Sequence, residues 1–135
     1  MTKILLADLF PDALTDALRA LVPAGCMVER VASASPEDFA RAAADADVLV
    51  CAFRRIDRAA LEVAPKVRLV QQFGIGYDNL DVAAIAAAGV AAGYCPGFNS
   101  VAVAEHTVLL MLAALRRFAD GEGATRQGRF PQMAF

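Results

Sequence analysis

The sequence predicts an α/β fold in which a doubly wound parallel sheet is followed by a long apolar helix. Short apolar runs alternate with helical segments through residues 1–99, and this alternation favours a parallel sheet with helices on both faces. The run at 48–52 lacks polar alternation and is rich in β-branched residues, as expected of a central strand. Five such runs are present, and the commonest order for five doubly wound strands is 2-1-3-4-5, the flavodoxin-like arrangement, which binds ligands outside the carboxyl ends of its strands.

Local signals place the individual elements. The first helix is expected to begin at Pro11 and Asp12, because the leucines that follow recur at i, i+4 and i+7. Ser35 is the expected N-cap of a second helix, and Asp57 and Asp81 are expected to cap two shorter ones. Strands are expected at 3–7, 26–31, 48–52, 68–73 and 90–94.

Composition narrows the class of protein. The chain has 135 residues, one domain's worth, with 13 basic and 15 acidic residues and a net charge of -2. Basic residues gather only in pairs, so nucleic acid is not an expected partner. The apolar run that begins at Ile4 is cut by Asp8 and is too short for a signal peptide or a membrane span, which favours a cytoplasmic protein. The three cysteines are scattered without C-x-x-C spacing, which suggests neither a disulfide framework nor a metal site.

The turns after the first and third strands exclude two functions of related folds. Asp8 and Asp12 flank the first turn and would repel the phosphate of a flavin. The segment 51–53 lacks the aspartate that a phospho-acceptor receiver domain would need, by resemblance to that family, at the end of its third strand.

A glycine turn follows the fourth strand, where Gly74 and Gly76 leave backbone amides open to a small anion. A dinucleotide fingerprint, G-x-G-x-x-G, would need a third glycine where Asn79 stands and an acidic residue about twenty positions further on, and the sequence supplies neither. No cofactor is therefore expected to bind this turn. On spacing alone, a tight turn without a ligand explains the sequence as well as a substrate loop does.

Two separated motifs then carry a resemblance. The runs GIGYDNLD (74–81) and PGFNSVAVAEHT (96–107), in this order, resemble the D-isomer-specific 2-hydroxyacid dehydrogenases, the formate, glycerate and phosphoglycerate dehydrogenase group. The resemblance covers the whole chain. It implies a substrate-binding domain at 1–99, an interdomain and dimer helix at 100–118, and a linker or tail at 119–135, with the nucleotide-binding domain absent.

The resemblance also implies the site. The amides of Ile75 and Gly76, in the loop opened by Gly74, would hold the carboxylate of a 2-hydroxy or 2-oxo acid. Arg54 stands in the loop after the third strand, either as a charged substrate contact or as a solvated surface arginine. The family's cofactor, NAD or NADP, and its catalytic residues belong to segments that this sequence lacks. Catalytic, cofactor-binding and metal-binding residues are therefore not expected in this chain, and whether it is an enzyme by itself is left open.

The helix expected at 100–118 is apolar around nearly its whole circumference. Such a helix needs partners on more than one side, so a homodimer through Ser100 to Phe118 is expected. His106, the only histidine, is expected to be structural. The leading interpretation is the substrate-binding domain of an NAD(P)-dependent D-2-hydroxyacid dehydrogenase, inactive alone. The alternative is a non-enzymatic flavodoxin-like module that associates with itself.

Overall fold

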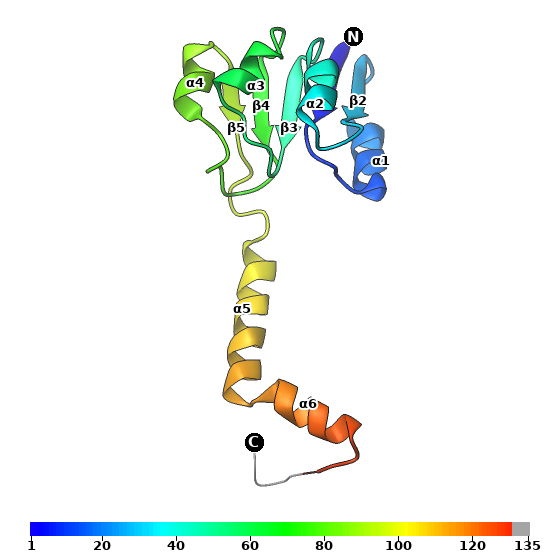
Figure 1. Cartoon of the computed structure of the whole chain (residues 1–135), viewed down its shortest axis with the longest axis vertical. Helices are drawn as coiled ribbons and strands as arrows, with labels where there is room; N and C mark the ends of the chain where they lie inside the picture. Colours follow the sequence, from blue (N-terminus) through cyan, green and yellow to red (C-terminus); the bar gives the residue numbers. More distant parts are fainter. Residues whose placement is uncertain (131–135) are drawn as a thin grey trace. The chain divides into compact units, whose positions relative to one another are not determined.

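The computed structural model describes residues 1–130, which divide into two compact units, one from Met1 to Pro96 and one from Gly97 onward. The first unit holds a five-stranded sheet in the order β2-β1-β3-β4-β5, and every neighbouring pair is parallel (Figure 1). The predicted fold class and strand order are therefore confirmed. The strands are β1 (Thr2–Leu6), β2 (Cys26–Arg30), β3 (Val48–Cys51), β4 (Leu69–Gln72) and β5 (Ala91–Gly93).

Four helices connect these strands, and their starts follow the predicted caps. The Ser35 hydroxyl accepts a hydrogen bond from the Asp38 amide, and the carboxylates of Asp57 and Asp81 accept from the amides three residues further on. Each cap satisfies one of the amides that the first turn of a helix leaves without a partner. The helices are α1 (Asp12–Leu21), α2 (Pro36–Ala43), α3 (Arg58–Glu62) and α4 (Val82–Ala87).

Two apolar layers lie on opposite faces of this sheet. Successive residues of β1 point to opposite faces, so Leu5 belongs to one cluster and Leu6 to the other. The larger cluster includes Phe39 of α2 and Ile85 of α4, while leucines of α1 pack against the smaller one. This burial on both faces is the environment that the continuous apolar run of β3 predicted.

The second unit contains α5 (Ser100–Leu115) and α6 (Phe118–Arg126). The helix expected to run unbroken to Phe118 ends at Leu115, because Arg117 adopts a left-handed backbone conformation with φ 47°. The segment from 119 onward, expected as a linker or tail, continues α6 as far as Arg126. Ion pairs between Arg117 and Asp120 and between Arg126 and Glu122 support this helix, although the segment carries two glycines.

The apolar side chains of α5 are exposed. None of its residues is buried, and Leu112 is 55% and Leu115 79% exposed. Within residues 1–130, no helix is both long and apolar enough to cross a membrane.

Candidate substrate-carboxylate site

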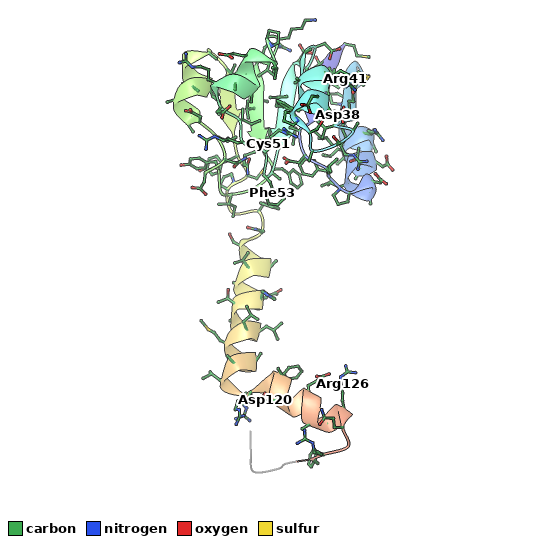
Figure 2. The ribbon with its side chains drawn as sticks, in the orientation of Figure 1. Asp38, Arg41, Cys51, Phe53, Asp120 and Arg126 are labelled. Carbon is green, nitrogen blue, oxygen red and sulfur yellow. The ribbon has the colours of Figure 1, made fainter. Side chains whose placement is uncertain are left out.

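The carboxyl ends of β3, β4 and β5 bring three turns to one edge of the sheet. The Phe73 amide donates to the Cys51 carbonyl across 2.6 Å, and the Cys95 amide donates to the Gly74 carbonyl across 2.9 Å. The turn at 52–54 follows β3, the turn at 74–76 follows β4, and Cys95 lies just beyond β5. Cys51 and Phe53 mark this edge in Figure 2. This is the edge at which doubly wound sheets bind their ligands.

The turn after β3 is already filled by a carboxylate of the same chain. Asp8, two residues beyond β1, accepts hydrogen bonds from the amides of Ala52 at 2.7 Å, Phe53 at 3.2 Å and Arg54 at 2.9 Å. Three convergent amides make a small anion-binding concavity, and here Asp8 occupies it. From the sequence, only a repulsive role towards phosphate was predicted for Asp8, because its partners lie 44 to 46 residues away.

The turn after β4 is open. Within residues 1–130, the amides of Ile75 and Gly76 have no hydrogen-bond acceptor, and Ile75 is 39% exposed. An N–H group of this kind, accessible from solvent, can donate to an anionic ligand at little cost in desolvation.

The glycines of this open turn are not required by the fold itself. Neither Gly74 nor Gly76 has a positive φ. A Cβ on Gly74 would lie 3.7 Å from Gln72 Nε2, and one on Gly76 would lie 3.6 Å from Asp78 Oδ2, both ordinary contacts. An alanine would therefore fit in either place, which leaves the close approach of a ligand as a reason for glycine.

Arg54 does not point freely into solvent. Its Nε donates to the Ala7 carbonyl at 2.6 Å and its Nη2 to the Ala34 carbonyl at 3.1 Å, and the guanidinium carbon lies 4.5 Å from the centre of the Phe39 ring. These contacts tie the β3 turn to β1 and α2. Contact between Arg54 and a substrate remains a prediction.

A buried polar network joins the two turns. Gln72, only 3% exposed, donates from Nε2 to the Ala52 carbonyl at 3.0 Å and accepts at Oε1 from Asn79 Nδ2 at 3.1 Å. Asn79 Nδ2 also donates to the Arg54 carbonyl at 2.9 Å, and the Cys51 thiol lies 3.4 Å from Gln72 Oε1. Burial and the nearby Asp8 carboxylate raise the pKa of Cys51 to about 12, and the hydrogen bond from Asn79 only partly opposes them. The thiol therefore stays protonated at neutral pH.

Comparison with known proteins identifies the family. Residues 4–132 match the family model of the D-isomer specific 2-hydroxyacid dehydrogenase, catalytic domain. The chain belongs to this family.

Relatives and solved structures agree with the assignment. The D-3-phosphoglycerate dehydrogenase of Methanocaldococcus jannaschii is 32% identical over the whole of this chain, which corresponds to 25% of that protein. An NAD-dependent formate dehydrogenase from Staphylococcus aureus, solved in complex with NAD, is 25% identical with a TM-score of 0.75, over 96% of this chain and 43% of that one. The TT0316 protein of Thermus thermophilus shares the fold, with a TM-score of 0.83 at 24% identity over 99% of this chain and 44% of that one. The chain thus spans about a quarter of the length of the phosphoglycerate dehydrogenases of Methanocaldococcus jannaschii and Archaeoglobus fulgidus.

The residues of this chain do not fit a dinucleotide at the glycine turn. Asn79 stands where the fingerprint requires its third glycine, and its side chain amide is bound to Arg54 and Gln72. The helix that follows, α4, has only six residues. Among residues 1–130, no group of three or more metal-ligating side chains could hold an ion.

Sequence reasoning missed Asp8, Gln72 and Asn79 as organisers of this edge. One signal was available for Gln72, which ends an otherwise apolar strand with a polar side chain that must find partners when buried. No local signal paired Asp8 with the β3 turn.

Proposed function

We propose that the unit Met1–Pro96 binds the carboxylate of a small 2-hydroxy or 2-oxo acid on the amides of Ile75 and Gly76. The observation that carries this proposal is a pair of amides, in residues that are exposed, without an acceptor anywhere in residues 1–130, on a turn whose glycines the fold does not need. Family membership supplies the class of ligand. Gly74 takes part by leaving room beside the amides, and Arg54 adds a positive charge near the same edge.

The proposal assigns binding and orientation to this chain. In a complete enzyme of the family, NAD or NADP would exchange a hydride with C2 of the acid. C2 is bonded to the carboxylate carbon, so holding the carboxylate on two fixed amides would also fix the position of C2 for hydride exchange with the nicotinamide. Asp78, beside Gly76, carries a negative charge that opposes an anion. The amides must therefore outweigh it, and weak binding is expected.

Titration with pyruvate, followed by the backbone amide resonances, tests the proposal. Two charge-assisted hydrogen bonds, offset by ordering costs, suggest a Kd on the order of 1 mM. The largest changes should fall on Ile75 and Gly76, and methyl pyruvate, which lacks the charge, should produce little change. Equal shifts with the ester, or shifts that avoid both residues, would contradict the proposal.

We also propose that the chain forms a homodimer through α5. Eight large apolar side chains of this helix are more than half exposed, and full burial of each is worth about 1.5–3 kcal/mol. The residues are Val101, Val103, Val108, Leu109, Leu110, Met111, Leu112 and Leu115. Exposure of this extent is typical of an interface.

Light scattering of the Leu112→Glu variant tests the dimer. A charge at this position should raise the dissociation constant of the dimer about tenfold or more, so that the variant is monomeric at tens of micromolar. Gln127→Glu is the matched control, because it adds the same charge at an exposed position after α6 and keeps the oxygen that accepts from Arg129. A monomeric wild-type chain, or identical behaviour of the two variants, would rule out α5 as the interface. Self-association without any binding of a 2-oxo acid would favour the alternative, a non-enzymatic module.

A further inference from the structure

The side chains of Gln72 and Asn79 connect two turns through hydrogen bonds, the open turn at 74–76 and the filled turn at 52–54. Gln72 ends β4, from which the open turn at 74–76 leaves, and its Nε2 reaches the Ala52 carbonyl of the filled turn at 3.0 Å. Its Oε1 receives Asn79 Nδ2 at 3.1 Å. The connection is buried, since Gln72 is 3% exposed, so solvent cannot readily replace a lost partner.

Asn79 closes the same connection from the other side of the open turn. Its Nδ2 donates to the Arg54 carbonyl at 2.9 Å, and its own carbonyl accepts from the Ile56 amide at 2.9 Å. The next residue, Leu80, donates to the Tyr77 carbonyl at 2.9 Å. The open turn is thus anchored at both of its ends to the segment 52–56.

We propose that Gln72 and Asn79 are positioning residues for the carboxylate site, fixing the amides of Ile75 and Gly76 relative to the turn at 52–54. Neither residue needs to touch the ligand. The expected effect on ligand affinity rests on the proposed function. The expected effect on the backbone order of the open turn rests on the hydrogen bonds alone. Two amides without partners on an exposed turn would otherwise move independently, and binding would then have to include the cost of ordering them.

Asn79→Ala removes the three side-chain donor bonds of Asn79, to Gln72 Oε1, to the Arg54 carbonyl and to the Cys51 thiol, while leaving the glycines and Asp8 in place. The expected result is a fall in the ¹⁵N order parameters of Ile75 and Gly76 from about 0.85 to below about 0.6, together with faster exchange of the Ile56 amide, which donates to the Asn79 backbone carbonyl. Pyruvate binding should weaken by about tenfold. Gln72→Leu, which fills similar space without polar atoms, should reproduce the loss of order.

Asp78→Ala is the control, because Asp78 lies in the same segment with an exposed side chain outside the connection. It should leave the order parameters unchanged. A merely structural role of Asn79 would instead raise amide exchange to the same extent in β1 and β2, and that result, or unchanged order in the open turn, would overturn the inference. If the wild-type chain fails to bind pyruvate, the proposed function fails, while the order parameters still decide whether Gln72 and Asn79 position the turn.

Discussion

The turns at 52–54 and 74–76 are neighbours at the carboxyl edge of the sheet, and they differ in whether their backbone amides have a hydrogen-bond acceptor. After β3, three amides at 52–54 converge on the Asp8 carboxylate at 2.7–3.2 Å. After β4, the amides of Ile75 and Gly76 have no acceptor among residues 1–130. The filled turn demonstrates that backbone at this edge can hold a carboxylate, and the open turn is the one at which we propose that a ligand binds. Asp8 therefore does more than repel phosphate, because it removes a competing anion site.

Removal of the Asp8 carboxylate should have the largest effect on this comparison. Asp8→Ala leaves three amides without their charged acceptor, and a loss of about 3 kcal/mol in the free energy of unfolding is expected, measured by urea denaturation. Asp8→Asn, which keeps one oxygen acceptor and loses the charge, should lose less.

Acetate provides the internal check on Asp8→Ala. If the emptied turn becomes an anion site, added acetate should restore part of the lost stability in Asp8→Ala and have no such effect on the wild type. Unchanged stability of Asp8→Ala would mean that water satisfies these amides as well as Asp8 does. The two turns would then not differ in how strongly their amides bind a carboxylate.

Alanine substitution of two glycines should separate binding from folding. Gly76→Ala should leave stability unchanged or slightly higher and weaken pyruvate binding about tenfold, because the added Cβ fits the fold but stands beside the amides. Gly76→Val, with a larger branched side chain, should weaken binding further.

Gly89→Ala should have the opposite effect to Gly76→Ala, a loss of stability without a loss of binding. Gly89 has φ +70° and open space around it, so alanine there should cost about 1–2 kcal/mol of stability and leave binding unchanged. Thermal unfolding and pyruvate titration of both variants provide the measurement. Parallel losses of stability and binding in Gly76→Ala would show that the open turn is only a structural turn.

The fold could be predicted because its signals are local. Alternating runs indicated the fold class, the commonest arrangement of five such strands supplied their order, and the caps at Ser35, Asp57 and Asp81 could be read from the residues beside each helix. Helix α6 had no such local signal, because the ion pair between Arg126 and Glu122 that supports it forms only once the helix exists.

The site could be predicted only in part. Glycines 74 and 76 mark a turn in any sequence, and the resemblance gave them a role, but sequence alone could not show that the amides of Ile75 and Gly76 are free. Nor could it show that Arg54 is held by Ala7 and Ala34, because those contacts join residues 47 and 20 positions apart. Long-range side chain to backbone bonds leave no periodic trace in a sequence.

The effect that is smallest near neutral pH concerns Cys51, whose thiol lies beside the filled turn and has its pKa raised to about 12 by burial and by the Asp8 charge. In the unfolded chain the thiol ionises near 9.0, so between about pH 9 and 12 the folded state keeps a proton that the unfolded state has lost. The free energy of unfolding should therefore fall with rising pH in this window, by up to about 1.4 kcal/mol per pH unit. Near neutral pH the thiol should contribute no slope.

Cys51→Ala isolates this contribution. Burial lowers the pKa of Lys3, but hydrogen bonds and charge attraction to Asp45 and Glu29 together outweigh it and hold that pKa above its ordinary 10.5, so Lys3 adds a loss of stability from about pH 10.5 upward, within the same window. The difference in slope between wild type and Cys51→Ala removes the Lys3 contribution. In a Cys26→Ser, Cys95→Ser background, Asp8→Asn should lower the pKa of Cys51 only modestly, as followed by thiolate absorbance, since burial is the larger cause. A pKa that does not move at all would mean that the Asp8 charge is fully screened, and one that falls to 9.0 would mean that loss of the charge opens the filled turn to water.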